Sequence, residues 1–171
     1  MPNYRRNYVQ GGTYFFTVTL KNRNSTLMVD HIAHLKFAFN KVKNTHPFHI
    51  NALVVLPEHL HCIWTLPEGD DNYPARWRAI KTLFCSQVGK ELNLVSRKGI
   101  WQWGYWEHTI RSDSDFAAHI NYVHFNPVKH GHVLKVMDWP YSTFHWYVSN
   151  GVYQKDWGGE NEKFEKNDFG E

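Results

Sequence analysis

Apolar residues change their spacing along the chain, and each change predicts a secondary-structure element. Residues 14–20 read YFFTVTL, an aromatic and β-branched run that follows the turn-forming pair Gly11-Gly12. This composition predicts a first strand. From Asp30, which we take as a helix cap, apolar positions recur at helical spacing as far as Pro47: Ile32, Leu35, Phe39 and Val42. That spacing predicts a first helix.

The central part of the chain predicts a hairpin, a helix and a further strand. Residues 48–56 are continuously apolar, as in a strand buried on both faces, and Pro57-Glu58 turns the chain into a second run over 59–66. Residues 73–94 place apolar side chains on one side of a helix. Residues 100–110 alternate with a period of two and predict a strand with a bulge at Gly104. The order is βαββαβ, which indicates an α+β fold.

A third helix follows that last strand. Ser112 and Asp115 form an S-x-x-D cap, and the apolar residues Phe116, Ile120 and Val123 continue at helical spacing. Pro127 lacks a backbone donor and disfavours helical geometry in the residue before it, so we expect the helix to end or kink there. Residues 1–157 then form one domain. Residues 158–171 contain five acids and two lysines and predict an acidic, mobile tail.

Composition excludes several classes of protein. A chain of 171 residues is long enough for one domain with its own core. Two cysteines are too few for a disulfide framework or a cysteine-built zinc site. Apolar runs stay well short of the roughly 20 residues that a membrane span needs. We therefore expect a cytoplasmic protein with no membrane segment.

The charge distribution suits a polyanionic partner. The formal net charge is +3, and the acidic tail leaves the rest of the chain more basic than that value. The same part is rich in aromatic residues, which stack on unpaired bases while cations attract phosphates. Charge alone indicates such a partner only weakly.

Two histidines are the first candidates for chemistry. His59 and His61 lie two residues apart on a predicted strand, so their side chains point to the same face, and Cys62 points to the other. Paired imidazoles can bind a divalent metal and leave coordination positions for substrate oxygens and water. Taken alone, this short motif is more often explained by two hydrogen-bonded structural histidines.

The third helix adds a nucleophile. Tyr122 and Asn126 are four residues apart and share one helix face, with His119 on the same side one turn earlier. Attack of a tyrosine oxygen on a phosphodiester gives a phosphotyrosine, which conserves the bond energy for rejoining the strand. A metal held by the histidines would stabilise the developing charge. Lys129, His119 and a metal-bound water are all open as the general base.

Together these motifs give a specific resemblance. The segments LPEHLHCIW and HINYVHFNPVKHG resemble the HUH superfamily of single-tyrosine transposases. The runs RWRAIK, GIWQWGYWEHTIR, YVHFNPVKHG and DWPYSTFHWY, in that order, resemble the REP-associated tyrosine transposases of bacteria. The resemblance covers the chain nearly to Trp157.

The resemblance implies a ferredoxin-like antiparallel sheet with helices on its faces and the catalytic helix after the last core strand. It implies that Tyr122 is the nucleophile and that His59, His61 and Asn126 hold Mg²⁺ or Mn²⁺. Asn126 stands where related insertion-sequence transposases usually have the longer Gln. The substrate implied is single-stranded, hairpin-forming repeat DNA, cut beside a short tetranucleotide and rejoined through a 5′-phosphotyrosine. Both a monomer and a homodimer are compatible with the sequence.

DNA contacts are predicted from exposed cations and aromatic residues. The candidates for phosphate binding are Arg5, Arg6, Arg76, Arg78, Lys81, Arg97, Lys98 and Lys129. A solvated charged face explains each of them equally well. Trp101, Trp103 and Trp106 are candidates for base stacking, although core packing is the commoner use of such residues.

Two other functions compete with this prediction. The protein could be a non-catalytic regulator that binds repeat hairpins, or a metal-dependent nuclease in which water replaces the tyrosine as the attacking group. The substitution Tyr122→Phe separates the three functions. It abolishes cleavage by a tyrosine enzyme, leaves hairpin binding by a regulator unchanged, and spares hydrolysis by water.

Overall fold

The centre of the protein is an antiparallel sheet of four strands. The computed structural model describes residues 5–94, 99–158 and 169. Its strands are β1 (Thr13–Thr19), β2 (His49–Val55), β3 (His59–Thr65) and β4 (Trp106–Thr109), in the spatial order β2-β3-β1-β4. The order and the antiparallel pairing are those of a ferredoxin-like βαββαβ fold, as predicted.

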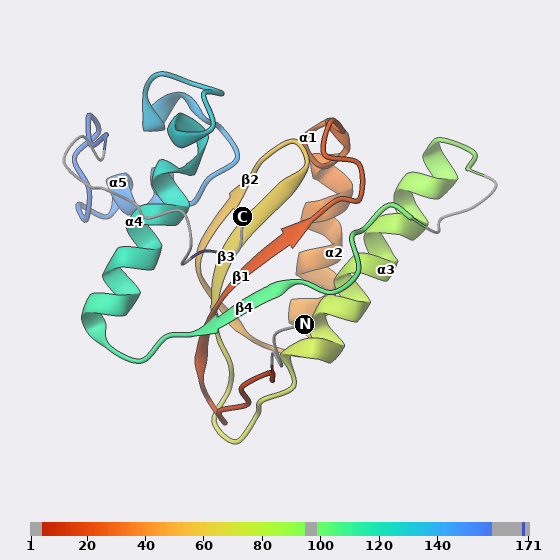
Figure 1. Ribbon diagram of the computed structural model, residues 1–171, viewed down its shortest axis with the longest axis horizontal. Coiled ribbons are helices and arrows are strands. Elements are labelled where there is room, and N and C mark those ends of the chain that lie inside the picture. The colour runs from red at the N-terminus through yellow and green to blue at the C-terminus, as the bar shows by residue number, and fades with distance from the viewer. Residues whose placement is uncertain (1–4, 95–98, 159–168, 170–171) are drawn as a thin grey trace.

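One face of the sheet is covered by α2 (Ile32–Thr45) and α3 (Tyr73–Glu91), which pack against each other (Figure 1). A short α1 (Leu27–Asp30) precedes α2. Aromatic rings fill the interface, and the indoles of Trp64 on β3 and Trp77 on α3 stack with centroids 4.3 Å apart. Rings of this size bury much apolar area, so this face contains the main core.

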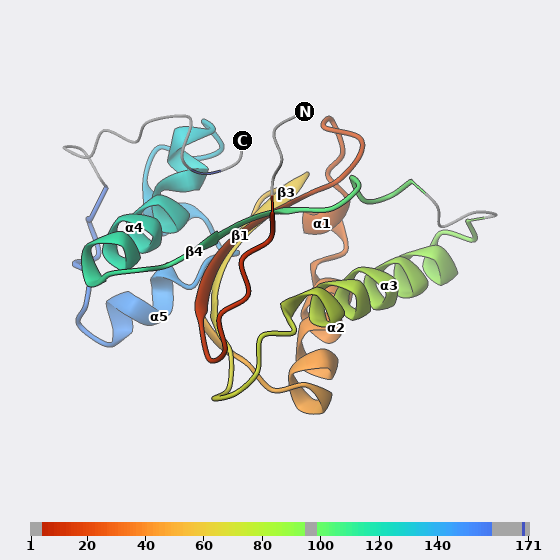
Figure 2. The ribbon, with the colours of Figure 1, turned by 60° about the horizontal axis from the view of Figure 1, so that its bottom comes forward.

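The opposite face is covered by α4 (Asp113–Lys129), with η1 (Val136–Asp138) and α5 (Phe144–Ser149) beside it (Figure 2). A second, smaller cluster joins Phe15 and Ile63 of the central strands to Ile120 and Val123 of α4. The sheet therefore has helices on both faces, and α4 lies on the face to which the side chains of His59 and His61 point.

Helix α4 begins as predicted and ends later than predicted. Ser112 Oγ accepts a hydrogen bond of 3.1 Å from the backbone N–H of Asp115. Of the two expectations for Pro127, an end or a kink, the end is wrong, because α4 continues through Pro127 to Lys129 and stops just before Gly131, whose φ is +73°. The two residues beyond Pro127 keep Lys129 on the same face as Tyr122, seven residues earlier.

Three other local predictions need correction. Asp30 does not cap α2 but closes α1, where its carboxylate accepts from the Thr26 hydroxyl at 2.6 Å. Strand β2 is not buried along both faces: it lies at a sheet edge, and its first residues are exposed or half-buried. Within 100–110 only Trp106–Thr109 is a strand, and Trp101 forms an isolated bridge to Leu20. Gly104, with φ at +73°, lies in the loop between them.

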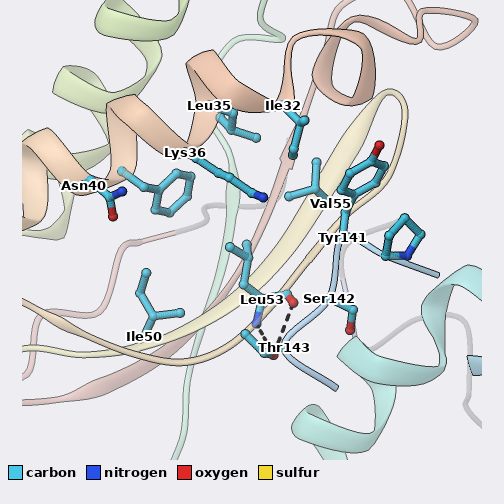
Figure 3. A pocket seen from close by; sticks show the side chains of 12 residues that line it. Ile32, Leu35, Lys36, Asn40, Ile50, Leu53, Val55, Tyr141, Ser142 and Thr143 are labelled. Carbon is cyan, nitrogen blue, oxygen red and sulfur yellow. Dashed lines mark hydrogen bonds between the residues drawn. The ribbon is translucent and has the colours of Figure 1, made fainter. Parts of the chain in front are cut away.

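The edge at β2 is extended by the segment 140–143. Thr143 accepts a hydrogen bond from Leu53 N at 2.9 Å, and Val54 bridges to Ser142 (Figure 3). Between this segment, β2 and α2 lies an apolar hollow of about 360 Å³. Among the helices of the described residues, none is both long and apolar enough to cross a bilayer.

Candidate functional site

The two predicted histidines lie side by side on the central strand β3. His59 is paired in register with Thr19 and His61 with Thr17 of β1, and the two imidazole centroids are 4.9 Å apart. Both side chains are buried beneath α4. The sheet thereby fixes the spacing of the two rings, as the alternation of the strand predicts.

Hydrogen bonds determine which nitrogen of each imidazole carries the proton and which carries the lone pair. Thr17 Oγ1 donates its proton to the backbone oxygen of Phe169 at 2.7 Å, so at 2.8 Å from His61 Nδ1 it accepts a proton from the ring. His59 Nδ1 lies 2.8 Å from the Glu58 carboxylate, which also accepts. In its neutral form each ring is therefore protonated on Nδ1 and carries its lone pair on Nε2.

Glu58 supports this arrangement electrostatically. Partial burial opposes ionisation of its carboxyl group, but the hydrogen bond from His59 and the charge of Arg23 outweigh burial and hold its pKa below the ordinary value. A carboxylate behind an imidazole orients the ring and increases its basicity as a ligand. Glu58 and Thr17 are functional candidates that the spacing argument missed, although Glu58 stands directly before His59 in the sequence.

Tyr122 faces the histidine pair from α4. Its buried ring lies 5.3 Å from that of His61, at 71° to it. Lys129 Nζ donates to the Tyr122 hydroxyl at 3.0 Å and lies 4.9 Å from the ring centroid. An ammonium ion at this position stabilises negative charge that develops on the phenol oxygen. The structure thus gives Lys129 a contact with the predicted nucleophile.

Asn126 completes the group one helical turn after Tyr122. Its side chain is fully buried, and the helix places it on the same face as Tyr122. Two imidazole Nε2 lone pairs and an amide oxygen form a neutral donor set that fits a divalent metal with coordination positions left for oxygen ligands. His59, His61 and Asn126 are the residues that would hold it.

Phe169 covers the ring of Tyr122. Its ring stacks on Tyr122 with centroids 3.7 Å apart and an interplanar angle of 7°, and its backbone oxygen accepts from Thr17. The sequence predicts a mobile acidic tail here, yet Phe169 is buried between the sheet and α4. The presence of an aromatic residue within an otherwise acidic tail is the sequence feature that could have indicated this burial.

Other histidine clusters lie elsewhere. Within the described residues, two groups have three histidine or carboxylate ligands close together: His31, His34 and Glu91, and His108, Asp115 and His119. Neither contains His59 or His61. His119 Nδ1 bonds to the backbone oxygen of Asp115 at 2.8 Å, and its ring packs against Phe169.

The candidates for DNA contact have separate environments. Arg76 is 2% exposed and its guanidinium binds the Asp70 carboxylate and three backbone oxygens, so it supports the start of α3. Arg5 and Arg78 are exposed, whereas Arg6 and Lys81 are half-buried beside Tyr105. Arg97 and Lys98 lie outside the described residues.

Of the three tryptophans predicted to stack on bases, Trp101 packs on Phe84. Trp103 is almost completely exposed, and Trp106 is partly so.

Comparison with known proteins gives close relatives. No family model matches the chain. It is 52% identical over 160 residues to the REP-associated tyrosine transposase of Escherichia coli K12, covering 94% of this chain and 93% of the relative. It is 43% identical over 166 residues to a putative REP-associated tyrosine transposase of Haemophilus influenzae, covering 93% and 94%.

A solved structure matches over the full length. A REP-associated tyrosine transposase bound to a REP hairpin superimposes with a TM-score of 0.89 and 51% identity, covering 100% of this chain and 98% of that one.

Proposed function

This chain belongs to the REP-associated tyrosine transposases, enzymes that cleave and join DNA with a tyrosine nucleophile, and we propose that its nucleophile is Tyr122. The observation that carries the proposal is the position of the Tyr122 ring, 5.3 Å from His61 and within hydrogen-bonding distance of Lys129. A polar nucleophile, a cation and two metal-binding imidazoles meet at one place between β3 and α4.

The substrate that we propose is a hairpin-forming single strand of repeat DNA. The solved relative is bound to a REP hairpin, and the close match in sequence and fold supports the same class of partner for this chain. We further propose that residues 1–157 act as a single catalytic domain. The sheet holds the histidines and α4 holds the tyrosine, so both parts of the site belong to one folding unit.

The reaction consists of two balanced transfers. The Tyr122 phenol gives up its proton and its oxygen attacks the phosphorus, which forms a 5′-phosphotyrosine and breaks the bond to the 3′ oxygen; that oxygen takes up a proton and leaves as a hydroxyl group. A 3′ hydroxyl later attacks the phosphotyrosine, restores the phosphodiester and returns the phenol oxygen, which regains a proton. Each step forms one phosphoester bond and breaks one, so rejoining the strand needs no nucleotide cofactor.

This chain's own residues prepare each step. Lys129 stabilises negative charge on the phenol oxygen, before attack and when the oxygen leaves. His59, His61 and Asn126 would hold Mg²⁺ or Mn²⁺, which would polarise phosphoryl oxygens and stabilise charge on the leaving 3′ oxygen. Glu58 and Thr17 keep both imidazoles in the tautomer that presents Nε2.

The proposal is tested with a labelled hairpin strand incubated with Mn²⁺ or with EDTA and separated on denaturing gels. We expect a metal-dependent, protein-linked band that Tyr122→Phe abolishes. His61→Ala should abolish the same band while filter binding of the hairpin is retained. A nicked product without the adduct would show that water attacks, and binding without cleavage would show a hairpin-binding regulator.

A further inference from the structure

A cluster of metal-binding side chains lies apart from Tyr122, where the start of α2 meets the end of α3. His31 is the residue between α1 and α2, His34 follows one turn later, and Glu91 is the last residue of α3. Helices α2 and α3 cover one face of the sheet and α4 covers the other (Figure 1), so this cluster is separate from the candidate active site.

The two imidazoles of this cluster converge on one carboxylate oxygen. His34 Nε2 is hydrogen-bonded to Glu91 Oε2, and His31 Nδ1 lies 3.4 Å from the same oxygen. One ligand atom from each of the three residues lies within 4.8 Å of the other two. Nitrogen and oxygen ligands around a tetrahedral zinc ion lie about 3.3–3.6 Å apart, so the distance from His31 Nδ1 to the carboxylate already matches such a site.

The helices fix the positions of these ligands. His31 N donates to the Leu27 oxygen at 3.0 Å, and His34 N donates to the His31 oxygen at 3.0 Å, so hydrogen bonds order the turn that carries both imidazoles. The two rings lie nearly parallel, with centroids 5.9 Å apart. Glu91 is brought to them by α3, which packs against α2 through the main core. Ligands carried on packed helices need little reorganisation when an ion binds.

The cluster is negatively charged and open to solvent. The hydrogen bond from His34, together with the charges of both histidines, holds the pKa of the Glu91 carboxyl below its ordinary value, so the carboxylate is ionised at neutral pH. The side chain of Glu91 is 53% exposed and that of His34 is 29% exposed. An ion can therefore enter from solvent, and water can occupy the coordination positions that the protein leaves open.

The donor set favours zinc. Two imidazoles and one carboxylate, completed by a water molecule, form a common four-coordinate set for Zn²⁺. The second cluster, formed by His108, Asp115 and His119, is less suitable. His119 Nδ1 is bonded to the backbone oxygen of Asp115 at 2.8 Å, and the rings of His108 and His119 stack with centroids 4.6 Å apart. In that cluster the protein itself already uses a ligand atom.

We propose that His31, His34 and Glu91 bind one zinc ion, which joins the start of α2 to the end of α3. The ion displaces the proton that His34 shares with Glu91, and that proton passes to solvent. Met28 N donates to the Pro57 oxygen at 3.2 Å, so α1 also contacts the turn between β2 and β3. The ion therefore connects α3, through α1, to that turn.

The test counts zinc ions per chain by equilibrium dialysis of the full protein followed by metal analysis. At a free zinc concentration just sufficient to saturate the wild type, Glu91→Gln and His34→Gln should each bind one ion fewer. His49→Gln removes an exposed histidine that belongs to neither cluster and should bind as many ions as the wild type. The difference of one ion is the same whether or not the candidate active site also binds zinc.

Urea unfolding with and without zinc is the second measurement. An ion that binds only the folded chain raises the ratio of folded to unfolded protein about 100-fold when its free concentration is 100 times the dissociation constant. Zinc should therefore raise the urea midpoint of the wild type more than that of Glu91→Gln. Mg²⁺ should change the two midpoints equally.

Two outcomes overturn the inference. If the wild type, Glu91→Gln and His34→Gln bind equal numbers of zinc ions, the cluster is an ion pair between two helices and not a metal site. If zinc shifts the urea midpoints of the wild type and Glu91→Gln equally, zinc does not join α2 to α3. Neither outcome affects the proposed function, because Tyr122 lies on the other side of the sheet.

Discussion

Lowering the pH should destabilise the protein through His124, a buried residue of α4. His124 lies between Tyr122 and Asn126 in sequence and is fully buried, with its Nε2 2.8 Å from Thr143 Oγ1. Burial, together with the charge of His145, lowers the pKa of His124 to about 3. In the unfolded chain a histidine has a pKa of about 6.5. His124 therefore binds a proton more weakly in the folded state than in the unfolded chain.

The sign and size of the effect follow from this difference. The stabilisation is fully present above pH 6.5 and is lost as the pH falls from about 6.5 towards 3, at about 1.4 kcal/mol per pH unit. At pH 5 the loss attributable to His124 is about 2 kcal/mol. Thr143 Oγ1 donates to the Leu53 oxygen at 3.2 Å, so it accepts from His124 Nε2, and the added proton must enter at Nδ1, which is buried with no hydrogen-bond partner among the described residues.

Urea unfolding at pH 7, 6 and 5 measures the effect in the wild type and in His124→Gln, which does not titrate. Other histidines whose pKa values are lowered by burial, such as His119 and His132, are present in both proteins. The wild type should lose about 2 kcal/mol more than the variant between pH 7 and 5. Parallel losses in the two proteins would refute the reasoning.

Three further substitutions test single contacts. Lys129→Met removes a charge-assisted hydrogen bond worth about 1.5–3 kcal/mol. The rate of single-turnover cleavage should therefore fall roughly 10- to 150-fold while hairpin binding is retained. An unchanged rate would contradict a role for Lys129 at the Tyr122 oxygen. Phe169→Ala uncovers the Tyr122 ring and removes a stacking contact worth about 0.5–1.5 kcal/mol. The cleavage rate should therefore rise about 2- to 12-fold. A slower rate would show that Phe169 assists catalysis instead. Arg76→Met leaves Asp70 and backbone oxygens without their buried donor and should lower the free energy of unfolding in urea by about 3–5 kcal/mol; a loss below about 1 kcal/mol would contradict its structural role.

Long periodic segments could be predicted from the sequence because their spacing alone determines which face is buried. The strand carrying His59 and His61 and the helix carrying Tyr122 are of this kind, so their side-chain directions followed from the periods of two and 3.6. The pairing of β3 with β1 then determined the position of His61 beside Thr17, a contact between residues distant in sequence that spacing does not reveal.

The errors arose where long-range contacts override a local signal. Residues 100–110 alternate like a strand, but Lys81 and Trp101 hold their first half as a loop against α3. Pro127 signals a helix end, yet α4 continues for two residues beyond it. Phe169 lies in an acidic segment, and its burial depends on contacts with Tyr122 and Thr17 that local composition cannot show.

The most direct test of the central claim is to identify the residue that becomes linked to DNA. Cleavage of a hairpin strand with Mn²⁺, followed by trypsin digestion and mass spectrometry, should yield a nucleotide-modified peptide spanning residues 112–129. Tyr122 is the only tyrosine in that peptide, so fragment ions should place the modification there. A nucleotide-linked peptide from another part of the chain, or cleaved DNA with no linked peptide, would contradict the assignment of Tyr122 as the nucleophile.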